Sequence, residues 1–368
     1  MKKILHMTPP DINNGVYRYI FNQMKYIDQN QYCFEFLTRN KDGLMETKEY
    51  QQYHFAIQSF QNTERESRYG LREEITHILK QDYDVIHLHT SIWRGFMIEE
   101  IAMELQVPKV IVHSHSSGMD FSSKEERERL LKIHEEYKSA FDMSKATDVC
   151  ACSKLAAEWL FGPQIPRNII KIMPNAIEVE KYQFRPKRRK ELREKLGVSN
   201  RIVIGNVGRY CYQKNQEFLI SAFAKAQKNN KKLFLLLLGE GELQSDIEQM
   251  IRKLGVEKSV LCLNWQQNVE DYLQVMDVFC LTSRFEGLPI SVIEAQAAGL
   301  PCFVADTVTD EVKITDLVTF LPLIEEEWKL ALEQSAMNDN RECFNREIAQ
   351  NGYDIREAVC MLEELYNF

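Results

Sequence analysis

The chain has 368 residues, of which 44% are hydrophobic and 27% charged, a balance typical of soluble globular proteins and a length that suits two domains. Its formal net charge of −8 argues against a general nucleic-acid-binding protein, because such proteins need a basic surface to meet phosphate groups. The nine cysteines form no C-x-x-C pair, which argues against zinc or dithiol chemistry and predicts a reducing, cytosolic setting.

Apolar runs that indicate buried strands alternate with amphipathic segments in the first half of the chain. The apolar stretch after Lys2 and Lys3 is too short for a signal peptide and predicts a first strand. The predicted strands cover residues 3–7, 33–37, 85–89, 109–113 and 148–153. The predicted helices cover residues 16–27, 71–79 and 125–141. Strands that alternate with helices indicate βαβ units and parallel sheets.

This rhythm breaks near residue 180 and then starts again. The second set of predicted strands covers residues 202–207, 233–238, 260–263, 278–281 and 301–305. The sequence therefore predicts an α/β protein with two Rossmann-like domains, residues 1–180 and 181–352, that face each other across a cleft. A last helix at about 353–368 carries one apolar stripe, and we expect it to pack back on the first domain.

The run from Arg185 to Lys195 is strongly basic and has two interpretations. It could be a patch for a membrane surface or a polyphosphate. The interpretation that we favour is a solvated first helix in which Glu191 and Lys195 lie four residues apart.

The segment from Arg284 to Pro301 reads RFEGLPISVIEAQAAGLP and predicts a ligand-binding turn. A strand ends near Ser283, a turn passes through Gly287 and Leu288, and Pro289 suits the first turn of a helix. The turn thus lies at the carboxyl edge of a parallel sheet, where open α/β folds bind ligands. The free N–H groups of the helix N-terminus suit a phosphate, Glu286 lies at the same edge, and Glu294, about a turn into the helix, can reach a ligand hydroxyl.

The segment IGNVGRYCYQKN, residues 204–215, predicts a second part of the same site. Gly208 follows the first strand of the second domain, and Arg209 and Lys214 flank a short loop before a helix. An arginine fork and a lysine point charge near a backbone turn are what a diphosphate needs.

Together these two segments resemble the retaining glycosyltransferases of family 4, which have the GT-B fold. The resemblance extends to residues 237–243 (LLGEGEL), 264–269 (NWQQNV), 152–154 (CSK) and 173–177 (MPNAI), and is closest to enzymes of bacterial exopolysaccharide and capsule assembly. It implies transfer of a hexose or N-acetylhexosamine from a nucleotide diphosphate sugar, expected to be UDP-linked, to a hydroxyl of a lipid-linked or growing polysaccharide.

The resemblance also implies roles for individual residues. Arg209 and Lys214 are similar to the pair that neutralises the donor diphosphate and assists its departure, Glu286 to the carboxylate on the transferred sugar, and Glu294 to the one on the ribose. Asn264, Trp265 and Gln266 lie where the family binds the nucleotide base.

Three candidates from the resemblance lie in the first domain. Asn14 and Gly15 resemble the glycine turn near donor phosphate and acceptor, although Asn14 replaces one glycine of the usual pair. His113 and His115 end a strand where the family often places a histidine that faces the reacting sugar. His115 is slightly preferred, and a purely structural role remains an alternative for both.

The sequence predicts that no cofactor and no metal ion is needed. Asp82-Tyr83-Asp84 matches the D-x-D string of metal-dependent glycosyltransferases, but it precedes a predicted strand and so belongs to the wrong sheet edge. Fixed positive charges and helix amides would neutralise the leaving diphosphate instead.

The sequence bears on three other functions. A dehydrogenase is disfavoured because Gly239-Glu240-Gly241 lacks the third glycine of the dinucleotide-binding fingerprint. A nucleotide-sugar epimerase of the same fold and a non-catalytic partner subunit remain alternatives. The expected partners are the nucleotide-sugar donor and a glycan or lipid-linked acceptor, without nucleic acid. Cytoplasmic location is expected, and peripheral attachment at the inner membrane face and homo-oligomer formation are left open.

Overall fold

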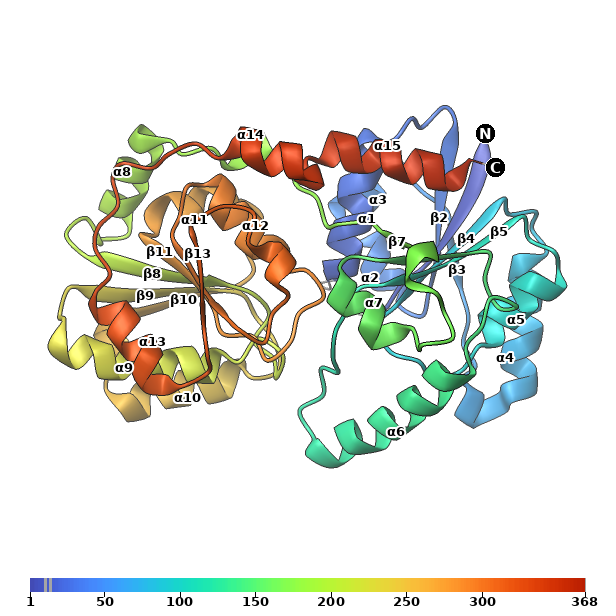
Figure 1. The fold of residues 1–368 in the computed structure, drawn as a ribbon, viewed down its shortest axis with the longest axis horizontal. Coiled ribbons are helices and arrows are strands. Elements are labelled where there is room, and N and C mark those ends of the chain that lie inside the picture. The colour runs from blue at the N-terminus through green and yellow to red at the C-terminus, as the bar shows by residue number, and fades with distance from the viewer. Residues whose placement is uncertain (10–11, 13–14, 368) are drawn as a thin grey trace. The chain divides into compact units, whose positions relative to one another are not determined.

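The computed structural model describes residues 1–9, 12 and 15–367, and the chain divides into two compact units (Figure 1). Unit 1 comprises residues 1–119, 128–176 and 355–368, and unit 2 comprises residues 120–127 and 177–354. The chain therefore leaves unit 1 at Ala176 and returns to it at Ile355 for its final helix. The short stretch 120–127 belongs to unit 2 although it comes from the first half of the sequence.

Unit 1 is built on a parallel sheet of seven strands in the order β3-β2-β1-β4-β5-β6-β7. The strands are β1 (Lys2–Met7), β2 (Tyr32–Thr38), β3 (Ile57–Ser59), β4 (Val85–Thr90), β5 (Lys109–Ser114), β6 (Asp148–Ala151) and β7 (Ile170–Ile172). The helices are α1 (Gly15–Tyr26), α2 (Lys41–Met45), α3 (Lys48–Tyr53), α4 (Glu64–Leu79), α5 (Met97–Glu104), α6 (Lys124–Ala140), α7 (Lys154–Leu160) and α15 (Ile355–Tyr366).

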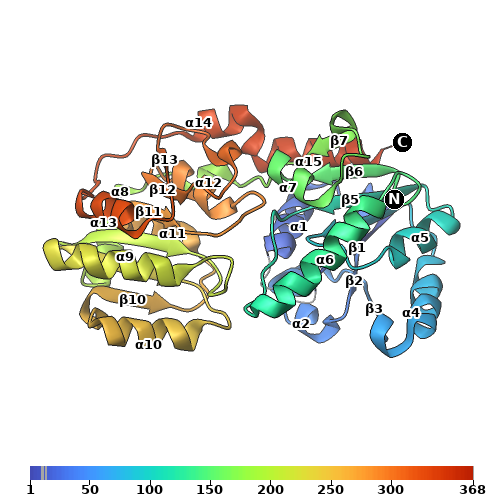
Figure 2. The same cartoon turned by 60° about the horizontal axis from the view of Figure 1, so that its bottom comes forward.

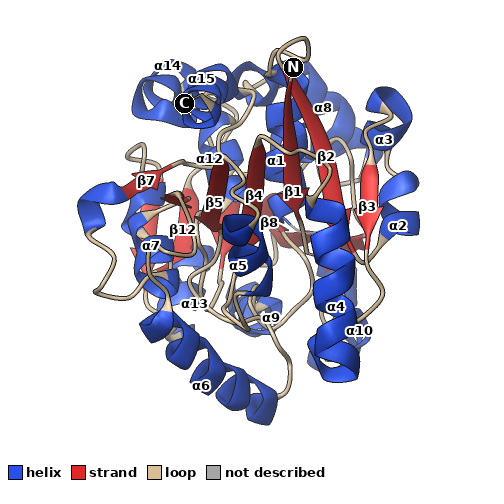
Figure 3. Ribbon diagram, turned by 90° about the vertical axis from the view of Figure 1, so that its right-hand side faces the viewer, coloured by secondary structure: helices blue, strands red, loops and turns tan. Residues whose placement is uncertain are grey.

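Helices α1 and α15 pack side by side on one face of this sheet, where they bury Ile4, Phe34 and Phe36. Helices α4 and α5 lie against the opposite face, in front of the strands in Figure 3. The last carbonyl groups of α15 accept hydrogen bonds from strand-end lysines: Lys2 Nζ donates to Tyr366 O at 2.9 Å, and Lys109 Nζ donates to Asn367 O at 2.9 Å. These cations complement the negative end of the helix dipole and fix α15 in unit 1.

Unit 2 is built on a parallel sheet of six strands in the order β10-β9-β8-β11-β12-β13. The strands are β8 (Ile202–Val207), β9 (Leu233–Leu238), β10 (Val260–Leu263), β11 (Val278–Leu281), β12 (Cys302–Ala305) and β13 (Val318–Leu321). The helices are α8 (Pro186–Lys195), α9 (Gln216–Asn229), α10 (Gln244–Leu254), α11 (Val269–Val275), α12 (Ile290–Ala297), α13 (Glu325–Glu333) and α14 (Asn345–Ile348). Helices α9, α10 and α13 cover one face, and α8, α11 and α12 cover the other (Figures 1 and 2).

The basic helix α8 is not simply solvated, so the favoured interpretation of this run was wrong for two of its residues. Arg189 and Arg193 are buried, with 3% and 4% exposure, and both bond to the fully buried Asp277. Arg189 also donates to the carbonyl groups of Gln274 and Met276, each at 2.8 Å. Residues four apart share one helix face, and here that face supplies the charges that balance a buried carboxylate.

The D-x-D string lies directly before β4, as the sequence predicted. Asp84 Oδ2 accepts a hydrogen bond from Lys3 N at 2.8 Å, and Tyr83 is buried and donates to Glu35 Oε2 at 2.8 Å. These residues therefore bind the amino ends of the strands together. Among the described residues, no helix is long and apolar enough to cross a membrane.

Candidate active site

The candidate site residues of unit 2 follow four neighbouring strands at the same edge of the sheet. Gly208 follows β8, Gly239 follows β9, Asn264 follows β10, and Ser283 lies two residues beyond β11. Because all these strands are parallel, their carboxyl ends lie at one edge. The sequence segments that carry the resemblance thus gather at one edge of one domain.

Three glycines allow the loops at this edge to pack against each other. Gly239 has a φ of +150°, and a Cβ atom there would lie 2.0 Å from Gly208 O. A Cβ atom on Gly241 would lie 2.4 Å from Tyr210 O, while Tyr210 N donates to Glu240 O at 3.0 Å. The GEG run, which sequence reasoning examined only as a dinucleotide fingerprint, therefore supports the loop that carries Arg209.

Lys214 and Glu286 form an ion pair at the centre of the site. Lys214 Nζ lies 2.6 Å from Glu286 Oε1, with side-chain exposures of 17% and 7%. The lysine stem passes over Gly208, where a Cβ atom would lie 3.2 Å from Lys214 Cδ. Glu286 also accepts hydrogen bonds from Ser283 Oγ at 2.7 Å and from Gln213 Nε2 at 3.0 Å. The loop after β8 and the turn after β11 are thus connected through one carboxylate.

Arg209 is held by a carboxylate that sequence reasoning missed. Its guanidinium donates to Asp120 Oδ2, and the other carboxylate oxygen accepts from Gln213 N at 3.0 Å. Gln216, at the start of α9, is buried and donates to Arg209 O at 2.9 Å. Asp120 lies in the segment 120–127, so no residue spacing along the chain could have indicated this pairing.

Gly287 and Leu288 lie in the turn before α12, which begins at Ile290 with Pro289 as its N-cap residue. Glu294, in the second turn of this helix, is fully buried and accepts a hydrogen bond from Tyr182 Oη at 2.7 Å. Tyr182 ends the short 3-10 helix η2 (Val179–Tyr182) near the start of unit 2. The carboxylate expected on the ribose is therefore oriented by a phenol whose role was not predicted.

The residues expected near the base lie beyond β10. Trp265 is 53% exposed, so its ring is available for stacking. Gln266 accepts a hydrogen bond from Tyr272 Oη at 2.9 Å and donates to Asn264 O at 3.1 Å. The two contacts hold the loop in a defined conformation beside the exposed indole.

In unit 1, His113 is fully buried on β5 and His115 is half-buried just beyond that strand. Both lie in a cluster of five histidines with His6, His87 and His89. Burial lowers the pKa of His6 and His115 to about 3, and it lowers the pKa of the other three well below the ordinary value. These imidazoles are therefore neutral at pH 7. Gly15 is exposed at the start of α1, and Asn14 lies outside the described residues.

Two protein-family descriptions match the chain, one in each half. Residues 13–181 match "Glycosyltransferase Family 4", and residues 188–319 match "Glycosyl transferases group 1". The two matches together span most of the chain and most strands of both sheets.

Individual proteins are similar over comparable lengths. The chain is 28% identical to "Putative glycosyltransferase EpsF" of Bacillus subtilis (strain 168), over 100% of this chain and 96% of the relative. It is 27% identical to "UDP-Gal:alpha-D-GlcNAc-diphosphoundecaprenol alpha-1,3-galactosyltransferase" of Escherichia coli, over 78% of this chain and 76% of the relative.

Solved structures share the fold at lower identity. The fold matches Anabaena Alr3699/HepE in complex with UDP and glucose with a TM-score of 0.76 at 19% identity, over 99% of both chains. It matches S. aureus TarM with a TM-score of 0.73 at 13% identity, over 100% of both chains. The chain therefore belongs to the glycosyltransferases that combine a family 4 domain with a glycosyl transferase group 1 domain, and it is an enzyme of the GT-B fold.

Proposed function

We propose that this glycosyltransferase moves a hexose or N-acetylhexosamine from a UDP-linked donor to a hydroxyl of a lipid-linked or growing polysaccharide, with retention of anomeric configuration. The observation that carries the donor site is the Lys214–Glu286 ion pair at the carboxyl edge of the β8–β13 sheet. The choice of UDP is supported by the complex of HepE with UDP and glucose and by the UDP-Gal in the name of the E. coli relative. That name also supports a diphosphoundecaprenol-linked acceptor.

The residue roles follow from charge and position. Arg209 and Lys214 are the two cations of the loop between β8 and α9, residues 208–215, which we call the β8 loop. A diphosphate bound there competes with Asp120 for Arg209 and with Glu286 for Lys214. Once the diphosphate takes the ammonium, Glu286 keeps its hydrogen bond from Ser283 and is set to accept from a sugar hydroxyl. Glu294, oriented by Tyr182, is assigned to the ribose, and Trp265 to the base.

Charge on the departing UDP is neutralised in this proposal by protein groups without a divalent metal ion. In this proposal Arg209 and Lys214 exchange Asp120 and Glu286 for the diphosphate when the donor binds, and they then stabilise the charge that develops on it, together with the turn at Gly287 and Leu288 before α12. His115 is assigned to the side of the reacting sugar because it is half-buried, while His113 is fully buried.

A thermal-shift screen tests the donor assignment. The full chain is heated with UDP, UDP-glucose, UDP-galactose, UDP-N-acetylglucosamine, UDP-N-acetylgalactosamine and GDP-mannose. A donor that binds the folded state raises the unfolding temperature by mass action. We expect UDP and at least one UDP-sugar to raise it, and a rise with GDP-mannose alone contradicts the assignment. Proton NMR of the product then tests retention, which an inverted anomer refutes.

A further inference from the structure

Five of the eight histidines of this chain lie on one face of the unit 1 sheet. His6 is paired in register with His87 across β1 and β4, and His89 is paired with His113 across β4 and β5. Residues that are paired in register point to the same face, as do residues two apart on one strand. The fifth, His115, continues this face beyond β5. Three adjacent strands thus place their imidazoles together beneath α1 and α15.

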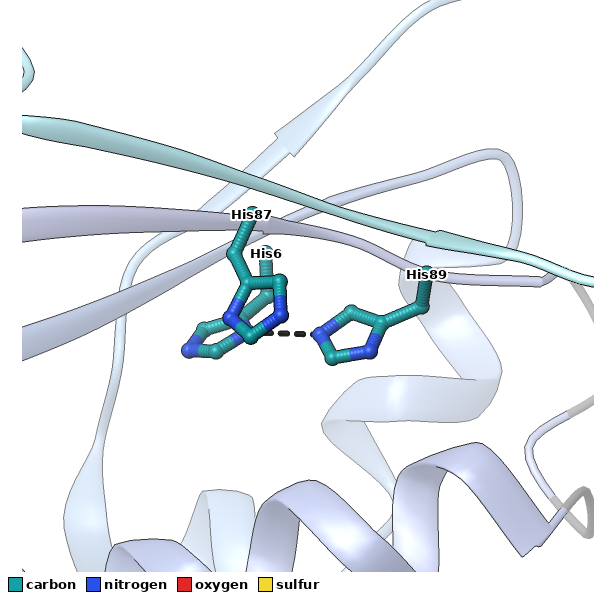
Figure 4. A group of neighbouring side chains, drawn as sticks. All are labelled: His6, His87 and His89. Atoms are coloured by element: carbon teal, nitrogen blue, oxygen red, sulfur yellow. Dashed lines mark hydrogen bonds between the residues drawn. The ribbon is translucent and has the colours of Figure 1, made fainter. Parts of the chain in front are cut away.

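The rings are joined nitrogen to nitrogen. His6 Nδ1 lies 2.9 Å from His89 Nε2, the contact drawn in Figure 4, and His89 Nδ1 lies 2.8 Å from His115 Nε2. His87 Nε2 lies 3.2 Å from His113 Nδ1, and its Nδ1 lies 2.8 Å from Tyr366 Oη.

Each hydrogen-bonded row of rings ends in a nitrogen that has no partner among the described residues. A neutral imidazole has one N–H and one lone pair, so the hydrogen bonds of the chain His6–His89–His115 all run in one direction or all in the other. In either direction, the buried His6 Nε2 has no partner among the described residues, and the same holds for His113 Nε2. An unpartnered buried nitrogen is costly in either tautomer, and in the direction in which His6 donates to His89 that nitrogen carries a lone pair of the kind that binds a metal ion.

The remaining buried histidine shows how this chain satisfies a purely structural imidazole. His134 Nδ1 accepts from Trp93 N at 3.0 Å, and His134 Nε2 lies 3.1 Å from Trp159 O, so backbone groups meet both nitrogens. The hydrogen bonds given above for the five clustered rings go to another histidine or to Tyr366, and none of them goes to a backbone group. The cluster therefore differs from an ordinary set of core histidines.

The spacing of one triad is close to that of a metal site. His6, His87 and His89 each offer a nitrogen, and the three nitrogens lie within 4.8 Å of one another. Nitrogens bound to one tetrahedral Zn²⁺ ion lie about 3.3 Å apart for Zn–N bonds of about 2.0–2.1 Å, so the most widely separated nitrogens need to approach by at most about 1.5 Å. Neutral imidazole favours Zn²⁺, Co²⁺, Ni²⁺ and Cu²⁺ over Mg²⁺ and Ca²⁺, which prefer oxygen ligands.

We propose that His6, His87 and His89 form a binding site for one divalent transition-metal ion, with Zn²⁺ as the natural occupant. A second triad, His89, His113 and His115, shares His89 and has similar spacing. We favour the first triad because ligation of His89 through Nε2 leaves its Nδ1–H to donate to His115. A ligating histidine commonly donates its other N–H in this way. The site lies in unit 1 and shares no residue with the proposed donor site of unit 2.

The test uses the full chain produced without a polyhistidine tag, treated with chelator and then titrated with Co²⁺, whose visible absorption reports nitrogen coordination. We expect saturation near one ion per chain, displacement by Zn²⁺ and no competition from Mg²⁺. His6→Asn and His89→Gln should each weaken Co²⁺ binding by at least about tenfold. His77→Gln, which changes an exposed histidine of α4, is the matched control and should bind like the wild type.

Three outcomes would overturn the proposal. They are no saturable Co²⁺ spectrum in the wild type, unchanged binding by the His89→Gln variant, and loss of binding in His113→Gln with retention in His6→Asn. X-ray absorption of the zinc-loaded wild type counts imidazole ligands directly, so the proposal stays testable if a variant fails to fold. Fewer than two imidazoles in that spectrum would also contradict it.

Discussion

Lys214 Nζ lies 2.6 Å from Glu286 Oε1, so a residue expected to meet the donor's diphosphate touches the residue expected to meet its sugar. The pair is mostly buried, with side-chain exposures of 17% and 7%, so each partner limits where the other can go. Binding of the diphosphate and positioning of the carboxylate are therefore coupled.

Removal of either cation of the β8 loop should impair transfer. We expect Lys214→Ala and Arg209→Ala each to lower kcat/KM by roughly 10²–10³, the scale for the loss of one preorganised charge stabiliser. Lys253→Ala, on the exposed face of α10, is the control and should keep wild-type activity. Steady-state assays of UDP release measure the effect. Activity within about threefold of wild type in both loop variants would refute the diphosphate assignment.

Glu286→Gln should separate sugar chemistry from nucleotide binding. The amide keeps one oxygen to accept from Ser283 and loses the negative charge, so the loop stays in place. We expect kcat to fall by roughly 10²-fold while the Kd of bare UDP changes less than about fivefold. Calorimetric titration with UDP checks the second half. Abolished UDP binding would show that Glu286 serves the nucleotide instead.

Asp120→Asn should strengthen UDP binding. The Asp120 carboxylate pairs with Arg209 and so competes with the diphosphate, while Asn retains an oxygen for Gln213 N. Both side chains are partly exposed, at 15% for Asp120 and 32% for Arg209, so the gain should be modest. We expect the Kd to fall about two- to fivefold, the scale of a partly exposed ion pair. A higher Kd would contradict this prediction and would mean that Asp120 positions Arg209 for the ligand.

Gly239→Ala should damage the β8 loop beyond the cost of backbone strain. Gly255→Ala is the matched control, because Gly255 also has a positive φ, of +68°, but its added Cβ meets nothing within 4 Å. The control should lose about 1–2 kcal/mol of unfolding free energy and keep UDP affinity. Gly239→Ala should lose more and also weaken UDP binding, because its Cβ would displace Gly208 O. Urea unfolding and calorimetry make the comparison, and equal effects would contradict it.

The histidine cluster should make the free energy of unfolding depend on pH. Burial lowers the pKa of these imidazoles below the unfolded value of about 6.5, so below that pH the unfolded chain binds more protons than the folded one. Their contribution to stability is therefore complete above about pH 6.5 and lost as the pH falls, in the case of His6 toward its pKa of about 3, by up to about 1.4 kcal/mol per pH unit for each histidine. Urea unfolding of wild type and His6→Asn checks this, since the variant should show a shallower slope.

The sequence predicted much of the fold because buried parallel strands are continuous apolar runs. The strands 202–207, 233–238, 260–263 and 278–281 were predicted to the residue. The strands β3 (IQS), β7 (IKI) and β13 (VTFL) were missed, since each is short and contains polar residues, whereas the equally short β10 (VLCL) and β11 (VFCL) are continuous apolar runs. The donor-site loops were placed at a sheet edge because a parallel sheet brings its carboxyl ends together.

What sequence reasoning missed depends on contacts between distant segments. Asp120 meets Arg209 from a loop 89 residues earlier, and Tyr182 meets Glu294 from 112 residues earlier. Of the five clustered histidines, the sequence indicated His113 and His115 as candidate site residues. The cluster itself requires the register of β1, β4 and β5, which no single segment encodes. Close backbone approach at Gly239 is equally invisible without the neighbouring loop.

We expect transfer to proceed without a divalent metal ion at the donor site. Activity measured directly after addition of EDTA should equal that in Mg²⁺, because in the proposed mechanism Arg209 and Lys214 neutralise the leaving diphosphate. The assay should be brief, so that slow extraction of an ion from the histidine cluster does not contribute. Complete loss that Mg²⁺ restores would contradict the assignment of the phosphate groups.

Mass-spectrometric analysis of an acceptor tests the central claim most directly. The purified chain is incubated with the UDP-sugar selected by thermal shift and a lipid-diphosphate-linked sugar as acceptor. The account predicts that the acceptor gains one hexose or N-acetylhexosamine with an equal amount of UDP released, and that Glu286→Gln does so far more slowly. Two results would contradict this claim. In the first, the acceptor stays unmodified while the UDP-sugar is converted to its isomer. In the second, both the acceptor and the UDP-sugar stay unchanged with every UDP-sugar tested.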